Sequence, residues 1–340
     1  MQTPHRAVPP LPEGSKSRIV VTGITGFVGG ALAWTVGQAG RTVVGLVRPT
    51  ANTTHLSNLK VELVQGDVTD PASLEGLFRG GDWLIHAAGM LGQSGLPESA
   101  YHQLHVEGTR YVLLAAAEAG VERVLYVSSP GVLGPIEGET TDETAPLAPS
   151  NPYERSKAAA EKAALEFAAR GLPVIIARPE FIYGPGDWHV LGLFQAVQKG
   201  LFFYIGNGQA VCHPTYIEDA VRGMVLCLEK GEPGQIYHIT GPRPVTFREY
   251  GETIADVLGV RRPWLRLPKA AAWIGAVGLE AVGKLTGMTP PLSRTGVAFF
   301  SENRRFSWQK AHRELGYQPR IELAEGIRRT AEWYRQQNLL

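Results

Sequence analysis

Short apolar runs recur through the first half of the chain, and Ala- and Leu-rich stretches separate them. An uninterrupted apolar run of about four to eight residues is typical of a strand buried in a parallel sheet. Such runs predict strands at 18–22, 42–47, 61–64, 83–87, 124–128 and 174–178, and helical patterns lie at 28–39, 71–78 and 102–119. Strands that alternate with helices predict an α/β fold with a doubly wound parallel sheet, the Rossmann architecture.

The pattern changes after about Tyr183, where glycine and proline become frequent and elements follow one another irregularly. Helices are expected there at 190–200, 217–229, 247–258 and 323–337. The sequence therefore predicts a Rossmann domain over 18–183, to which some later segments return, and a smaller α+β substrate-binding region over 184–340. The proline-rich residues 1–17 are expected to form a disordered lead-in.

Composition and charge narrow the possible functions. The formal net charge of the 340 residues is +1, which gives no overall basic surface for nucleic acid or an anionic membrane. Cys212 and Cys227 are far apart in sequence, so we expect free thiols in a reducing cytoplasm and no metal site. The longest apolar stretch, 270–282, contains Glu280 and is too short to span a bilayer. It is expected to form an amphipathic surface helix, and a membrane-surface role is the alternative.

A glycine-rich turn follows the first strand and opens the first helix. Residues without side chains there would let a dinucleotide pyrophosphate approach the amides at the helix N-terminus. The context of strand, turn and helix favours this interpretation over a tight turn that binds nothing. The candidate cofactor residues of the turn are Gly23, Thr25, Gly26, Phe27, Val28 and Gly29.

The end of the second strand bears on the choice of dinucleotide. NAD enzymes of this fold carry a carboxylate there for the ribose 2′-hydroxyl, whereas this chain has Arg48 and no carboxylate. Arg48 could pair with a 2′-phosphate, so the sequence favours NADP, with NAD as the alternative. Asp67 and Val68, after the third strand, could contact the adenine. A solvated arginine and a turn aspartate are the simpler interpretations.

The segment 152–157 is the strongest sign of catalysis. Asn151 is a plausible N-cap, Pro152 suits the first helical position, and Glu154 completes a capping-box pattern. The helix would place Tyr153 and Lys157 on one face, where a nearby ammonium would lower the pKa of the phenol. A serine at the end of the fifth strand, Ser128 or Ser129, could hydrogen-bond a substrate oxygen at the same edge of the sheet.

Together these motifs resemble the extended short-chain dehydrogenase/reductases, the NAD-dependent epimerase/dehydratase group. The resemblance runs from Arg18 to near the C-terminus, through residues 22–29, 66–68, 86–89, 127–129, 152–157 and 178–187. It implies that Tyr153 is the general acid/base, that Lys157 is its electrostatic partner and that Ser129 polarises the substrate oxygen. It also implies cofactor contacts from the glycine turn, Asp67, Tyr153 and Lys157 and from His86, Ala87, Ala88 and Pro179. A homodimer is common in the resembled family.

Three positions depart from the family pattern. His105 replaces an asparagine that steadies backbone and water near the active site, so it could act as a proton relay or be a histidine satisfied by a backbone carbonyl. Phe181 and Cys212 replace an asparagine and an arginine that serve nucleotide-sugar diphosphates. These changes, with apolar residues such as Trp188, favour a pocket for an apolar molecule. Segments 285–294 and 314–319 resemble sterol dehydrogenase-like and dihydroflavonol reductase-like branches.

Three functions follow from these features. The first is a dehydrogenase or reductase that acts on a secondary alcohol or ketone of an apolar small molecule, with Ser129, Phe181, His105 and Trp188 as expected substrate contacts. The second is a nucleotide-sugar epimerase or dehydratase that keeps its NAD tightly bound. The third is a non-catalytic dinucleotide-binding protein, which the presence of both Tyr153 and Lys157 disfavours.

Overall fold

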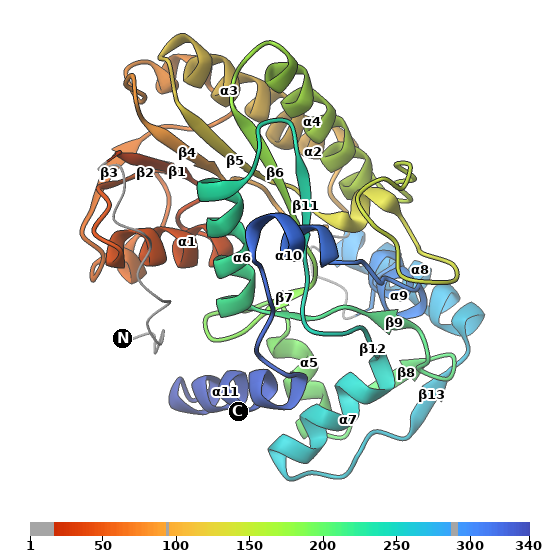
Figure 1. The fold of residues 1–340 in the computed structure, drawn as a ribbon. Coiled ribbons are helices and arrows are strands. Elements are labelled where there is room, and N and C mark those ends of the chain that lie inside the picture. Colours follow the sequence, from red (N-terminus) through yellow and green to blue (C-terminus); the bar gives the residue numbers. More distant parts are fainter. Residues whose placement is uncertain (1–16, 93–94, 287–291) are drawn as a thin grey trace.

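Seven parallel strands form one central sheet (Figure 1). The computed structural model describes residues 17–92, 95–286 and 292–340, so the predicted lead-in lies outside the described residues except for Ser17. The strands are β1 (Ile19–Thr22), β2 (Val43–Val47), β3 (Val61–Gln65), β4 (Trp83–His86), β5 (Arg123–Val127), β6 (Val174–Pro179) and β11 (Ile236–Ile239). The predicted doubly wound α/β fold is confirmed.

The order of the strands positions the site. They run β11-β6-β5-β4-β1-β2-β3, and every neighbouring pair is parallel. The chain winds outward from β1 to β3 and then returns to the other side of β1 with β4. In such sheets ligands bind outside the carboxyl ends of the strands, where the winding direction reverses. All of the chemistry predicted above therefore belongs at one edge of the sheet.

Helices cover both faces of the sheet (Figure 1). Helices α1 (Phe27–Gln38) and α6 (Ile217–Lys230) pack together on one face, and α3 (Gly108–Glu118) and α4 (Pro152–Ala169) pack together on the other. Helix α6 and strand β11 come from the C-terminal half of the chain. The short helix α10 (Gln309–Leu315) contacts both of them.

The remaining C-terminal segments lie together below the carboxyl edge of the sheet in Figure 1. Three two-stranded pairs occur there: β7 (Ile182–Tyr183) with β10 (Thr215–Tyr216), β9 (Val211–Cys212) with β12 (Val245–Thr246), and β8 (Phe203–Ile205) with β13 (Leu265–Leu267). The helices are α5 (Leu191–Gln198), α7 (Phe247–Leu258), α8 (Lys269–Thr286), α9 (Arg294–Ser301) and α11 (Leu323–Gln336).

Three elements differ from the sequence prediction. The helix expected at 71–78 is a 3-10 turn over Pro71–Leu74, since Gly76 adopts a left-handed backbone conformation (φ 70°) that ends it. The helix expected at 102–119 starts earlier, at α2 (Glu98–Tyr101), and passes through a π-helical segment, His102–Glu107, before α3. Strand β11 was not predicted, because its four residues, Ile-Tyr-His-Ile, are too few and too mixed for an apolar run and lie far from the other strands in sequence.

Candidate active site

The glycine turn brings β1, the end of β4 and the start of α1 into close contact. Gly23 has φ 73°, and a Cβ atom there would lie 2.6 Å from the carbonyl oxygen of Ala87. A Cβ atom on Gly29 would overlap the carbonyl oxygen of Gly23. Gly26 is the N-cap of α1, and no side chain caps the helix or places an acidic group in its first turn. The turn therefore fits a pyrophosphate, because its geometry excludes side chains and its helix N-terminus has no competing anion.

The cofactor candidates beside the glycine turn differ in whether their side chains already have partners within the protein. Arg48 lies exposed just beyond β2 and makes no side-chain hydrogen bond or ion pair to the residues that the structure describes. Asp67 holds its own turn, since its Oδ1 atom accepts hydrogen bonds from the amide and hydroxyl of Thr69 at 2.9 and 2.8 Å. Val68 is buried against Gly108. Arg48 is thus available to a ligand, whereas Asp67 already has a structural role.

His86 is buried and already hydrogen-bonded. Its Nδ1 atom lies 2.6 Å from the hydroxyl of Thr22, and its Nε2 atom lies 3.0 Å from the hydroxyl of Thr109. Burial lowers its pKa to about 3, and the charge of Lys157 adds to the effect. The neutral ring ties β1, β4 and α3 together. A contact from this strand end to a cofactor would therefore come from Ala87 and Ala88, beside the glycine turn.

Ser129, Tyr153 and Lys157 meet at the carboxyl edge of the sheet. Asn151 caps α4 as expected, and its side chain accepts the amide hydrogen of Glu154 at 3.0 Å. The Lys157 ammonium donates to the carbonyl of Val127 at 2.7 Å, and the Ser129 side chain interacts with the phenol of Tyr153. The preceding serine, Ser128, points into the protein instead and donates to Glu161. Only the second serine of the pair is thus placed beside Tyr153.

The charge states of this group differ from the sequence-based expectation. Burial raises the pKa of Tyr153 to about 12, while the hydrogen bond from Ser129 lowers it. Burial also lowers the pKa of Lys157 to about 8, although the negative charge of Glu161 acts to raise it. The predicted lowering of the phenol pKa is therefore wrong for this structure, because the desolvation of the phenol is the largest effect on it. At neutral pH Tyr153 is a phenol and can donate a proton.

His105 lies in the π-helical segment between α2 and α3. Its Nε2 atom accepts the amide hydrogen of Met90 at 3.0 Å, so the proton sits on Nδ1 and is donated to Ser156 at 2.8 Å. Its ring meets the ring of Tyr153 edge-on at 5.7 Å. Burial, with the charge of Lys157, lowers its pKa to about 3. The partner is an amide rather than the expected carbonyl, and the neutral, fully bonded ring favours positioning over proton relay.

The predicted substrate residues fall into two places. Phe181 adopts φ 37°, which is rare for a residue other than glycine, and its ring packs on Tyr250 and Phe299 at 5.3 and 5.2 Å. Trp188 is 62% exposed and contacts Trp333 of α11. Within the described residues the structure thus gives Phe181 an aromatic wall and does not bring Trp188 to Tyr153.

Sequence reasoning missed a buried charged cluster near Tyr153. Glu154 accepts from the amide of Ser150 at 2.8 Å, rather than from that of its N-cap as a capping box requires, and it pairs with Arg304 at 2.8 Å. Glu180 is 4% exposed, and its carboxylate makes no hydrogen bond within the described residues. Its charge nevertheless acts on Tyr153. The bend after β6 and the separation of 150 residues between Glu154 and Arg304 left no local signal for this cluster.

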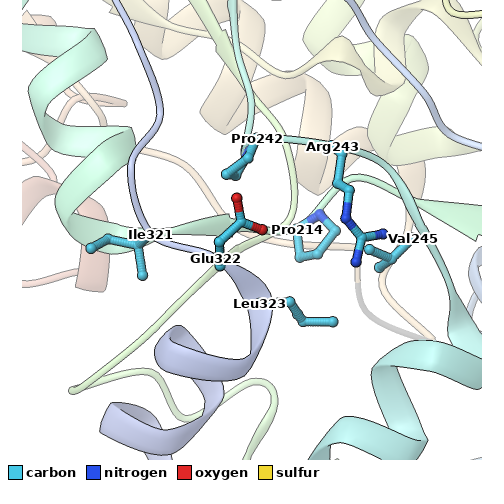
Figure 2. A pocket seen from close by; sticks show the side chains of 7 residues that line it. All are labelled: Pro214, Pro242, Arg243, Val245, Ile321, Glu322 and Leu323. Atoms are coloured by element: carbon cyan, nitrogen blue, oxygen red, sulfur yellow. The ribbon is translucent and has the colours of Figure 1, made fainter.

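A pocket lies at a different place, between the start of α11 and the segments that flank β10 and β12. Figure 2 shows the carboxylate of Glu322 between Pro214 and Pro242, with Arg243 to one side. None of the predicted site residues lines it. Across the described residues, no helix is long and apolar enough to cross a membrane. The same residues contain no group of three or more His, Cys, Asp or Glu side chains that could hold a metal ion.

Comparison with known proteins agrees with this geometry. The model of the NAD dependent epimerase/dehydratase family matches residues 19–240. The chain is 31% identical to a 2-alkyl-3-oxoalkanoate reductase of Stenotrophomonas maltophilia, over 92% of this chain and 98% of that protein. It is 33% identical to a 3beta-hydroxysteroid-dehydrogenase/decarboxylase of Arabidopsis thaliana, over 80% of this chain and 66% of that protein.

A solved structure extends the comparison to three dimensions. The dTDP-glucose 4,6-dehydratase DesIV of Streptomyces venezuelae, determined with NAD and TYD bound, aligns with a TM-score of 0.78 at 28% identity. The alignment covers 94% of this chain and 98% of that one. The chain therefore belongs to the NAD dependent epimerase/dehydratase family, and it is an NAD(P)-dependent oxidoreductase of the extended short-chain type.

Proposed function

We propose that this enzyme transfers hydride between a nicotinamide and the secondary alcohol or ketone carbon of an apolar small molecule. The observation that carries this proposal is the cluster of Phe181, Tyr250 and Phe299, because sequence neighbours of two of these rings approach Tyr153. Glu180, whose charge acts on Tyr153, is followed directly by Phe181. Thr295 of α9 and Tyr153 both lie close to Gly92. Phe299 follows one turn later on α9, and its ring packs on Phe181. Such aromatic side chains suit contact with a hydrophobic molecule better than with a charged diphosphate.

The proposed roles follow from the charge states. Tyr153, as a phenol with a pKa of about 12, would donate its proton to a substrate carbonyl oxygen, which Ser129 would hold by a hydrogen bond. Lys157 lies one helical turn after Tyr153 in α4, and its ammonium would stabilise the resulting phenolate. When bound, the nicotinamide supplies or accepts the hydride.

We further propose NADP as the cofactor. Gly23, Gly26 and Gly29 would surround the pyrophosphate, and Arg48 would meet the 2′-phosphate. The support for NADP is that Arg48 is exposed without an ion pair in the described structure, and that no carboxylate ends β2. NAD is the alternative, and relatives with bound NAD keep it open. A homodimer in the cytoplasm belongs to the same proposal, and sedimentation velocity would test the dimer.

An assay of ketones and secondary alcohols with each cofactor tests the function. We expect consumption of NADPH with an apolar ketone, and a higher kcat/KM for NADPH than for NADH. Tyr153→Phe should lower kcat by about 10²–10⁴-fold while binding of the cofactor, followed by thermal shift, is unchanged. Tyr111→Phe on α3 is the matched control. If no ketone or alcohol changed the absorbance of either reduced cofactor, the proposal would fail.

A nucleotide-sugar dehydratase or epimerase is the second candidate, and the likeness to DesIV favours it. Against it stand Phe181 and Cys212, since Cys212 is a fully buried thiol whose pKa burial raises well above its usual value. Stabilisation of the protein by a UDP- or dTDP-sugar would reverse the order of the two candidates. So would NAD retained through purification and identified by mass spectrometry.

A further inference from the structure

Helix α8 buries its one acidic residue, Glu280, and exposes apolar side chains. The buried positions are Ala272, Ala276 and Glu280; the two alanines pack with Val297 of α9 and Ile205 of β8. Glu280 pairs with Arg294 at 2.7 Å. All other positions from 270 to 282 are exposed, and all are apolar or glycine: Ala270, Ala271, Trp273, Ile274, Gly275, Val277, Gly278, Leu279, Ala281 and Val282. Ile274 is 73% exposed, so this face lacks a covering partner in the described chain.

Within residues 261–294 the exposed charges have one sign, although Arg262 pairs with Glu252 and Asp256 of α7. Residues 261–294 contain six of the 33 Lys and Arg residues of the chain but one of its 32 Asp and Glu residues, which is the buried Glu280. Arg261, Arg266 and Lys269 are exposed, and no ion pair to the described residues engages them. Trp264, just before β13, is 66% exposed. The overall charge of +1 conceals this local basic and apolar surface.

We propose that α8 and the segment 261–268 before it bind the surface of an anionic lipid bilayer. The apolar face of α8 would enter the boundary between headgroups and acyl chains, Trp264 and Trp273 would lie at headgroup level, and the basic side chains would meet lipid phosphates. A second copy of the chain fits this face less well. A two-fold contact would place the basic residues of both copies against one another, with no exposed acidic residue in 261–294 to pair with them.

The bilayer contact would lie close to the active site. Helix α9 packs on α8, and the Thr295 methyl group and the Cβ atom of Tyr153 each lie 3.5 Å from the Cβ position of Gly92. An apolar substrate dissolved in the bilayer would therefore reach the catalytic tyrosine from this side. This last step rests on the proposed function, whereas the lipid binding does not.

Co-sedimentation with vesicles tests the proposal on the full chain without substrate or cofactor. We expect the protein to pellet with vesicles of equal parts phosphatidylcholine and phosphatidylglycerol, and much less with phosphatidylcholine alone. The double variant Ile274→Asp, Val277→Asp should weaken this binding roughly tenfold or more, because it places charges on the inserted face. Leu201→Asp, which changes an equally exposed leucine after α5, should bind as the wild type does.

A second variant keeps the helix intact. Arg261→Gln with Arg266→Gln should weaken binding to the anionic vesicles several-fold and remove part of its salt dependence. Unchanged melting temperatures would show that the variants fold. Failure of the wild type to bind anionic vesicles, or equal binding by the aspartate variant, would overturn the proposal. So would a dimer in sedimentation velocity that Ile274→Asp dissociates, since the face would then belong to a second copy. A result on vesicles stands whether or not the enzyme reduces ketones.

Discussion

At the scale of single residues, Glu180 is a buried carboxyl group that the sequence did not point to and whose charge raises the pKa of Tyr153. Burial raises the pKa of Glu180 to about 7; the charge of Arg304 opposes this shift and that of Glu154 adds to it. A carboxyl group with a raised pKa in the folded state is favoured when protonated. Its contribution therefore turns unfavourable as the pH rises from about 4.5 to 7, where the folded state binds more protons than the unfolded state. Above pH 7 the buried charge costs up to about 3 kcal/mol.

Glu180→Gln removes this charge while keeping the shape of the side chain. We expect the variant to gain stability relative to the wild type at pH 8, and to show little or no gain at pH 5, where the wild-type carboxyl is protonated. Urea unfolding at the two pH values measures the difference. Glu118→Gln, on the exposed surface of α3, controls for the change of functional group. An identical stability difference at both pH values would show that the Glu180 carboxyl is not perturbed as described.

At the scale of elements, the π-helical segment positions α4, the helix that carries Tyr153 and Lys157. His105 links this segment to the end of β4 through Met90 and to α4 through Ser156, whose hydroxyl donates in turn to the carbonyl of Tyr153 at 2.7 Å. His105→Ala should lower kcat about 10–100-fold, because small displacements of a reacting group are costly, with little effect on cofactor affinity. His105→Asn should restore part of the activity, and the exposed His102→Ala is the control.

The pH profile separates positioning from proton relay. The pKa of His105 is lowered to about 3, so the ring stays neutral between pH 5 and 8. We therefore expect the profile of kcat/KM for His105→Asn to keep the wild-type shape in that range. Loss of a titration near pH 6.5 in this variant would instead identify His105 as a relay.

The same scale shows what the sequence could predict. The six strands that lead to β6 and the main helices follow from apolar periodicity, and Asn151 and the glycine turn follow from local backbone chemistry. The π-helical turn could not be predicted, because its hydrogen-bond pattern depends on the contacts of His105 with Met90 and Ser156. The pKa of Tyr153 was predicted in the wrong direction, because residue spacing reports a neighbouring charge but not the burial that outweighs it. The pairing of Glu154 with Arg304 exists only in the folded chain.

At the scale of the whole molecule, one buried network joins four elements behind the active site. Arg178 of β6 pairs with Glu161 of α4, lies 3.4 Å from His238 of β11, and shares Glu161 with Ser128 at the end of β5. Both partners of the ion pair are almost fully buried. Glu161 also acts on Lys157. Its negative charge raises the pKa of the Lys157 ammonium, whereas burial lowers it. The network therefore couples the assembly of the sheet to the charge of Lys157.

Glu161→Gln should act on both stability and catalysis. It leaves Arg178 buried without its carboxylate, which should cost about 3–5 kcal/mol of unfolding free energy. It also removes the attraction that holds up the pKa of Lys157, so this pKa should fall below about 8 and the alkaline limb of the kcat/KM profile should move to lower pH. Glu166 lies on the same helix as Glu161 and forms a surface pair with Arg110 of α3, so Glu166→Gln should change stability by about 0–1 kcal/mol and leave the profile in place. A destabilised Glu161→Gln enzyme with an unshifted profile would separate the two effects and assign Glu161 to the fold alone.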